Sequence, residues 1–221
     1  MNRLSTKLGK SFFLFLAYLW ELCRMSRSTN SYPTGSIPIK AETDSGFIYS
    51  VTQGGKTTVY ISIDGSSNAL EWIANFIILK TGRWFSHIGF DVPAGIFFKQ
   101  VLSYLVDKKY LSSAIDIMVI GHSRGGSIAQ LINMRLVEKG FNSRCISFGS
   151  PKVGGFLFHL FNHKLRIKHT RVNIKEDVVT QTPPSFMWGH YQTDSVICPC
   201  KEFGIYKVHL SYGKRLNELA L

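Results

Sequence analysis

The stretch from residue 115 to residue 131 constrains the fold of this chain more than any other. It opens with the apolar run IDIMVI (115–120), which has the length of a buried strand, and passes through the turn GHSRGG (121–126). The residues after the turn follow a helical spacing until Gly140, a typical helix end. Their apolar positions are Ile128, Leu131, Ile132 and Leu136. A buried strand that turns within a few residues into a helix is typical of α/β sheets.

Other strand and helix patterns alternate along the rest of the chain. The runs FIYSV (47–51) and TVYISI (58–63) flank Gly54 and Gly55 and predict a hairpin. Apolar residues at helical intervals predict a helix over 96–110. Two later apolar runs predict further strands: SRCISF (143–148) and TRVNI (170–174). Together these patterns predict an α/β fold with a mostly parallel central sheet and helices on both faces.

The 221 residues are expected to form one α/β domain, over 36–221, preceded by a distinct segment over 1–35. The segment has a basic start and a short apolar run from Phe12 to Trp20. The run is too short to span a bilayer, and no small-residue cleavage site follows it. We expect a helix packed on the domain, with a signal peptide or a membrane-surface anchor as alternatives. A cytoplasmic or membrane-surface location is favoured over secretion.

The chain is strongly basic, with 26 Lys and Arg against 14 Asp and Glu and a formal net charge of +12. Such a charge favours an anionic partner, either an acidic membrane surface or nucleic acid. No nucleic-acid-binding motif accompanies the charge, so we expect a membrane surface and no nucleic acid. The cysteines lack the paired spacing of a zinc site, and we expect no metal. They are Cys23, Cys145, Cys198 and Cys200.

The turn at 121–126 places Ser123 between Gly121 and Gly125, in the pattern GxSxG. Between a buried strand and a helix, this pattern is typical of a nucleophile on a sharp, strained turn. Small residues on either side are needed because the backbone folds tightly there. The helix that follows offers N–H groups and a positive dipole to a developing oxyanion. Ser123 is therefore the candidate nucleophile.

A serine hydroxyl needs a histidine to take its proton and a carboxylate to orient that histidine. On such a sheet the expected chain order is serine, acid, histidine. Asp177 lies just after the predicted strand 170–174, where the carboxyl ends of the strands gather a site. Glu176 and Asp194 are the rival acids. Both His190 and His209 follow Asp177, so chain order alone leaves the base open.

Several segments resemble the class 3 lipases, the fungal triacylglycerol lipase group of α/β-hydrolases. GHSRGGSIA is similar to the family's elbow, and FGSPKVGG (148–155) is similar to the segment after its next strand. VNIKEDVVTQTPP resembles the family stretch with the triad aspartate, which implies that role for Asp177. VHLSYG (208–213) resembles the stretch with the triad histidine, which implies His209 as the base. The resemblance extends from about Val59 to Gly213, including DGSSNALEWIANF and HIGF.

The same resemblance implies the residues of the oxyanion hole. Its two backbone N–H groups would come from Ser66 and from Arg124, the residue after the nucleophile. The segment Ser67 to Phe76 would correspond to the family's hinged lid. Its apolar residues can share one helical face, as in a lid or in an ordinary core helix.

Two positions depart from the family pattern. The family usually has an arginine where this chain has Asp64, and often an apolar residue where it has Arg124. The interval from Asp177 to His209 is also short, which would trim the loops around an acyl groove. The resemblance implies a serine carboxylic-ester hydrolase without metal or organic cofactor, either a triacylglycerol lipase or a phospholipase A, acting on a lipid ester. The alternative is a catalytically silent scaffold that binds lipid or a protein.

Overall fold

The computed structural model describes residues 9–64, 82–110, 114–183, 194–198 and 204–221. Its described strands form one sheet in the order β1-β2-β3-β4-β5-β6-β7, so each strand lies beside its neighbours in the chain. The strands are β1 Ile37–Ala41, β2 Asp44–Gln53, β3 Lys56–Ile63, β4 Ile115–His122, β5 Asn142–Phe148, β6 Lys168–Ile174 and β7 Asp194–Cys198. The pairs β1–β2 and β2–β3 are antiparallel, and β3 to β7 run parallel.

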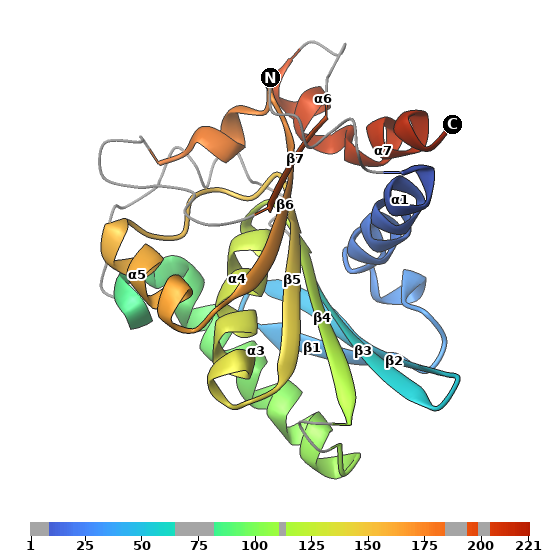
Figure 1. Ribbon diagram of the computed structural model, residues 1–221, viewed down its shortest axis with the longest axis vertical. Helices are drawn as coiled ribbons and strands as arrows, with labels where there is room; N and C mark the ends of the chain where they lie inside the picture. The colour runs from blue at the N-terminus through green and yellow to red at the C-terminus, as the bar shows by residue number, and fades with distance from the viewer. Residues whose placement is uncertain (1–8, 65–81, 111–113, 184–193, 199–203) are drawn as a thin grey trace.

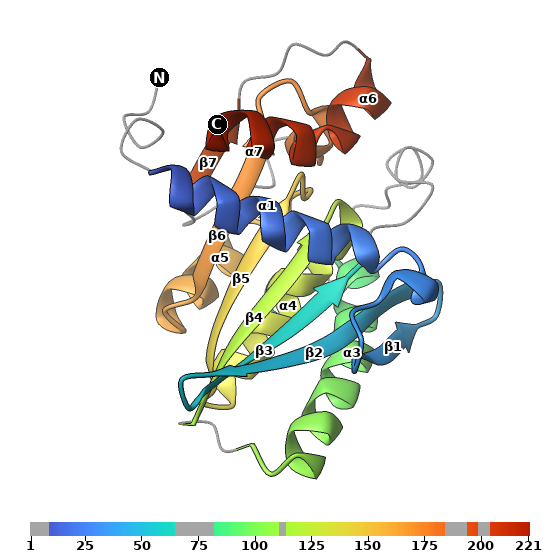
Figure 2. The same ribbon diagram turned by 90° about the vertical axis from the view of Figure 1, so that its right-hand side faces the viewer.

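Helices cover both faces of this sheet (Figures 1 and 2). The helices are α1 Lys10–Met25, α3 Ile88–Asp107, α4 Arg124–Glu138, α5 Phe156–Lys164, α6 Ile205–Leu210 and α7 Tyr212–Ala220. Short 3₁₀ turns are η1 Thr29–Ser31, η2 Arg83–Phe85 and η3 Val178–Gln181. Buried side chains of α3, α4 and α5 pack on one face, and those of α1 and α7 pack on the other. The prediction of an α/β fold with a mostly parallel sheet and helices on both faces is confirmed.

The strands β2 and β3 form the predicted hairpin around Gly54 and Gly55. Gln53 pairs with Lys56, so the loop contains only these two glycines. Both have positive φ, 59° and 77°, as the common two-residue hairpin turn requires. Glycine adopts such angles without a Cβ clash, which explains why the turn forms here.

Helix α1 lies across the sheet beside α7, as Figure 2 shows. Its apolar side is buried, including Leu16, Leu19 and Trp20. Trp20 packs against the rings of Phe148 at the end of β5 and Tyr212 at the start of α7. Within the described ranges, no helix is both long and apolar enough to cross a membrane.

Candidate active site

Ser123 stands on a strained turn between β4 and α4. Its backbone has φ 54° and ψ −131°, a region that residues with a Cβ rarely adopt. The strand–turn–helix pattern predicts this geometry, and the structure contains it. Its N–H donates to the carbonyl of Phe148 at 2.9 Å, which ties the turn to the end of β5. The strain is therefore held in place by the neighbouring strand.

The glycines on either side of Ser123 leave no room for a side chain. A Cβ on Gly121 would overlap the carbonyl group of Gly125. A Cβ on Gly125 would overlap the carbonyl group of Asp64, at the end of β3. The turn thus packs backbone against backbone, which explains the GxSxG spacing in physical terms.

Helix α4 begins at Arg124, directly after Ser123. The first N–H groups of a helix have no acceptor within the helix and lie at the positive end of its dipole. The Arg124 side chain points away to Asp44 at the start of β2, with Nε to Oδ1 at 3.2 Å and Nη2 to Oδ2 at 2.9 Å. Nη2 also donates to the carbonyl of Gly89 at 3.1 Å. The charge of Arg124, which stands where the family often has an apolar residue, is thereby paired with Asp44 inside the protein.

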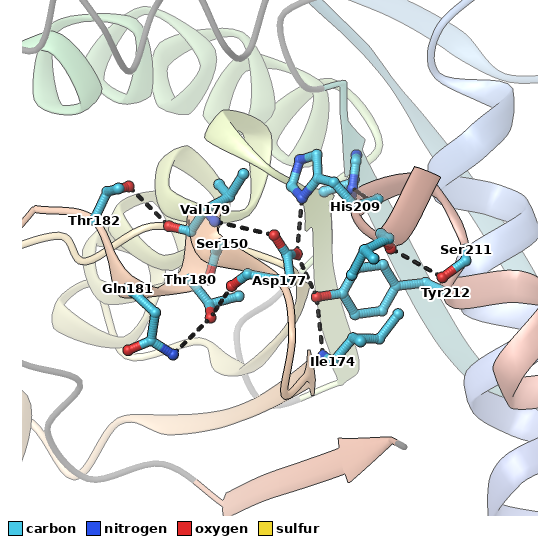
Figure 3. A network of polar contacts seen from close by, with 12 residues as sticks. Ser150, Ile174, Asp177, Val179, Thr180, Gln181, Thr182, His209, Ser211 and Tyr212 are labelled. Carbon is cyan, nitrogen blue, oxygen red and sulfur yellow. Dashed lines mark hydrogen bonds and ion pairs between the residues drawn. The ribbon is translucent and has the colours of Figure 1, made fainter. Parts of the chain in front are cut away.

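Asp177 lies in the loop after β6, at the start of η3, and its side chain is fully buried. Figure 3 shows three donors converging on its carboxylate. Oδ1 accepts from the N–H of Val179 at 3.0 Å, while Oδ2 accepts from Tyr212 Oη at 2.7 Å and pairs with His209 Nδ1 at 2.8 Å. A carboxylate with this many donors is fixed in one orientation.

His209 lies on the short helix α6 and is 4% exposed. Its Nδ1 faces Asp177, so the proton on Nδ1 leaves Nε2 as the basic nitrogen. Nε2 is buried and has no hydrogen-bond partner among the described residues. The His209 ring lies 4.4 Å, between centroids, from the ring of His122, the residue before Ser123. The structure thus brings Ser123, Asp177 and His209 to the same end of the sheet.

The rival acids lie elsewhere. Glu176 is exposed, in contrast to the buried Asp177 beside it. Asp194 begins β7 and pairs with Thr170, near the start of β6, whereas Asp177 follows the end of that strand. His190, Ser66 and the predicted lid over 67–76 lie outside the described residues.

The loop that carries Asp177 is also held by Lys152, in the segment FGSPKVGG. Lys152 is 3% exposed, and its Nζ donates to the carbonyls of Gln181 at 2.7 Å and Pro183 at 2.8 Å. Burial lowers the pKa of Lys152, and the nearby Arg171 lowers it further. The ammonium group therefore stabilises the turn that follows Asp177.

The described cysteines are buried in the core: Cys23, Cys145 and Cys198. Burial raises the pKa of each of these thiols. Among the residues that the structure describes, no group of three or more His, Cys, Asp or Glu could hold a metal ion.

Three residues of the site were not predicted from the sequence. Tyr212 contacts Asp177, Asp44 pairs with Arg124, and His122 lies against His209. Tyr212 follows His209 by three residues in VHLSYG, so its place in that motif is the one signal that could have revealed it. Asp44 gives no local signal because its partner is distant in the chain.

Known proteins resemble this chain in sequence and in fold. The family described as Lipase (class 3) matches residues 60–187. "Secreted mono- and diacylglycerol lipase 1" of Fusarium solani is 28% identical over 158 residues, covering 66% of this chain and 45% of that protein. "Phospholipase A1-Ialpha2, chloroplastic" of Arabidopsis thaliana is 27% identical over 166 residues, covering 61% of this chain and 34% of that protein. The chain thus spans less than half the length of either relative.

A solved structure has the same fold. It is that of a triacylglycerol lipase whose catalytic centre is formed by a serine protease triad. It aligns with a TM-score of 0.70 at 20% sequence identity, covering 88% of this chain and 82% of that one. The family match itself covers more than half of the chain and contains both the elbow and the loop of Asp177. The chain therefore belongs to the class 3 lipase family, as its sequence motifs predict.

Proposed function

We propose that this chain is a serine carboxylic-ester hydrolase that acts on lipid esters. The observation that carries the proposal is the state of His209, with Nδ1 on a buried carboxylate and Nε2 unpartnered among the described residues. The His209 ring packs against the ring of His122, the residue that precedes Ser123 on the strained turn. A neutral imidazole in that arrangement is suited to take the proton of a serine hydroxyl.

The first half of the reaction forms an acyl-enzyme. Ser123 Oγ attacks the ester carbonyl carbon while His209 Nε2 takes the hydroxyl proton. The carbonyl oxygen gains a negative charge, which the backbone N–H groups of Arg124 and Ser66 stabilise as donors. The tetrahedral intermediate then collapses, the ester C–O bond breaks, and Nε2 returns the proton to the departing alcohol.

The second half reverses the roles. Water loses a proton to His209 Nε2 and attacks the acyl carbon, and the collapse releases the fatty acid and restores the Ser123 hydroxyl. In both halves Asp177 keeps the proton of His209 on Nδ1 and stabilises the imidazolium. All of these steps use groups of this chain, the ester and water.

The substrate class follows from the family, whose members act on lipid esters. The relatives named above are a mono- and diacylglycerol lipase and a phospholipase A1, so neutral glycerides and phospholipids are the substrates to compare. An ester panel should therefore contain a monoacylglycerol, a diacylglycerol, a triacylglycerol, a diacyl phospholipid and a short-chain soluble ester.

The decisive experiment is labelling with a fluorophosphonate probe, followed by peptide mapping. Label on the peptide that contains Ser123, and its loss in Ser123→Ala, are expected. Ser103→Ala on α3 is the matched control, because Ser103 is exposed and alanine suits a helix. Absence of label in the folded wild-type chain, with no ester turnover, would favour a silent scaffold instead.

The net charge of +12 supports a second part of the proposal, binding to an anionic lipid surface. Turnover on vesicles with anionic lipid should then exceed turnover on neutral vesicles at low salt. The advantage should shrink as salt screens the charges, whereas hydrolysis of a soluble ester should hardly change. Equal turnover on both kinds of vesicle at low salt would contradict it.

A further inference from the structure

His122 is enclosed between the elbow, α1 and α6. It precedes Ser123, is 2% exposed, and both nitrogens of its ring are engaged. Nε2 lies 2.9 Å from the main-chain oxygen of His209, and Nδ1 lies 3.0 Å from Nη2 of Arg27. Trp20 of α1 packs edge-on against the same ring at 5.1 Å between centroids. Every polar atom of this side chain therefore has a defined partner.

The two contacts require one and the same tautomer. A carbonyl oxygen only accepts, so the proton must be on Nε2, where it is donated to His209. A guanidinium only donates, so Nδ1 must be the bare nitrogen that accepts from Arg27. Both requirements describe neutral His122 with the proton on Nε2. Burial lowers the pKa of His122 well below its usual value, and the neighbouring His209 and Arg27 lower it further.

The neutral state matters because His209 becomes positively charged in the proposed reaction. A cation on His122, with the two rings 4.4 Å apart, would repel that imidazolium. The hydrogen bond from Nε2 also fixes the backbone of His209. Helix α6 contains only six residues, so this bond to its main chain restricts where the His209 ring can lie.

Arg27 comes from the segment just after α1 and is itself held. Its Nε lies 3.4 Å from Oδ1 of Asp64, at the end of β3, which offsets part of its charge. Asp64 is the residue that stands where the family usually has an arginine. In this chain the cation that contacts His122 is thus Arg27, and the carboxylate that pairs with Arg27 is Asp64, one of the two residues that differ from the family pattern.

We propose that Arg27 and His122 are positioning residues for His209. Arg27 fixes the tautomer of His122, and the His122 Nε2–H fixes the main chain of His209 so that its Nε2 lies at Ser123. The segment after α1 is thereby a working part of the active site. This inference rests on the proposed function and identifies residues outside its three reacting groups.

The test uses four variants of the full chain. Arg27→Met removes the donor and keeps a long side chain. Arg24→Met is its matched control, because Arg24 is exposed and its side chain pairs with Glu21, one turn earlier on α1. His122→Phe keeps a ring without either nitrogen, and His122→Gln keeps an amide N–H that can donate to the His209 carbonyl. Each variant is assayed for kcat, KM and melting temperature.

Arg27→Met should lower kcat on the order of tenfold with KM within about twofold, because a small displacement of a reacting group acts on the chemical step. Arg24→Met should leave kcat unchanged. His122→Phe should lower kcat by roughly a hundredfold, and His122→Gln should recover a large part of that loss. Equal losses in His122→Gln and His122→Phe, or losses that follow the melting temperature in all variants, would overturn the proposal.

A spectroscopic measurement separates this inference from the proposed function. Ring ¹⁵N shifts of wild-type His122 should report a neutral imidazole with the proton on Nε2, and Arg27→Met should move these shifts and those of His209. If the chain hydrolyses no ester but shows this tautomer and this response, the proposed function is refuted, whereas the Arg27–His122–His209 contacts are supported. If the chain is active but the ¹⁵N shifts of His122 and His209 do not change in Arg27→Met, only the positioning role is refuted.

Discussion

Arg124 and Asp44 form a buried two-point ion pair directly beside Ser123. The Arg124 side chain is 11% exposed and that of Asp44 is 2% exposed. Two parallel contacts join the guanidinium to the carboxylate, and a third joins it to the carbonyl of Gly89. The elbow, the start of β2 and the start of α3 are thus connected by one side chain.

Removing the Arg124 side chain should destabilise the fold, because it leaves the buried carboxylate of Asp44 without its cation. Burial raises the pKa of Asp44 to about 6, even though Arg124 lowers it, and Glu42 adds to the rise. In Arg124→Leu the carboxyl has no cation, so its pKa should rise further and the protonated form should dominate at pH 5. The free energy of unfolding should then fall as the pH rises, with a loss on the order of 3 kcal/mol at pH 8.

A second substitution tests the cause. Adding Asp44→Asn to Arg124→Leu should restore most of the lost stability at pH 8, measured by denaturant unfolding. Lys56→Leu is the control, because its pair with Asp116 lies at the surface and should contribute less than about 1 kcal/mol. A double variant no more stable than Arg124→Leu would contradict this account. Activity should persist, since the proposed oxyanion donor of Arg124 is its backbone N–H.

The stability of the protein should depend on the charge state of His122. Its pKa is depressed in the folded state, so the folded chain resists a proton that the unfolded chain accepts. Stability from this group is therefore present above the ordinary histidine pKa of about 6.5 and is lost as the pH falls below it. Unfolding free energies of wild type and His122→Gln between pH 5 and 8 should diverge below pH 6. Their slopes should differ by up to about 1.4 kcal/mol per pH unit, and parallel curves would contradict the prediction.

Tyr212→Phe should weaken both the fold and the reaction. The Tyr212 hydroxyl donates to Asp177 Oδ2 and accepts from the N–H of Ile174 at 3.1 Å. Its removal leaves a buried N–H without its acceptor, which costs about 1–3 kcal/mol, and frees one side of the carboxylate. We expect a lower melting temperature and a kcat reduced roughly tenfold. Tyr18→Phe on the exposed side of α1 is the control, and an effect of equal size there would refute the assignment.

Asp177→Asn should lower kcat by about 10³ to 10⁴, because an amide cannot keep the proton of His209 on Nδ1. The neighbouring Glu176→Gln should leave kcat within about twofold, since Glu176 is exposed. Asp194→Asn should behave like Glu176→Gln. Ester turnover by purified variants measures all three, and a larger loss in Asp194→Asn would move the acid to that residue.

The two candidate bases can be compared in the same assay. His209→Ala should lower kcat/KM by at least about 10³, the scale of removing a triad member, whereas His190→Ala should change it less than about tenfold. The reverse order would assign the base to His190.

The sequence predicts the strands and helices whose apolar residues form a clear local pattern. The runs 47–51, 58–63, 115–120, 143–148 and 170–174 all lie within observed strands, because buried strands are continuous apolar runs. The helix predicted over 96–110 begins earlier, at Ile88, and contains Pro93, a residue that argues against a helix interior. The carbonyl of Gly89, which the missing N–H of Pro93 leaves without its helical donor, accepts from Arg124 instead. Sequence analysis does not predict strand β1, which contains Pro38; β1 lies at the edge of the sheet, where proline is accepted.

Further elements that the sequence does not predict have short or weak patterns. Helix α5 buries only Phe158 and Asn162, so no apolar face marks it. Helix α7 buries Tyr212, Leu216 and Ala220 on one side, but a pattern of only three residues at this spacing does not distinguish a helix from a loop. For the site, residue order and motif favoured Asp177 and His209. The contacts of Arg27 with His122 and of Asp44 with Arg124 could not be predicted, because nothing local in the sequence links residues that lie 95 and 80 positions apart.

The late position of α6 and α7 in the chain has a consequence for biosynthesis. Proteins are made from the N-terminus, and a domain generally folds as a unit. The residues of the elbow with Ser123 and of the loop with Asp177 are synthesised before α6 and α7, and so is Trp20, which packs against Tyr212 of α7. A nascent chain therefore carries its proposed nucleophile and acid without the base. In the proposed function, ester hydrolysis therefore requires the docking of these C-terminal helices, and a nascent chain that lacks them is expected to be inactive.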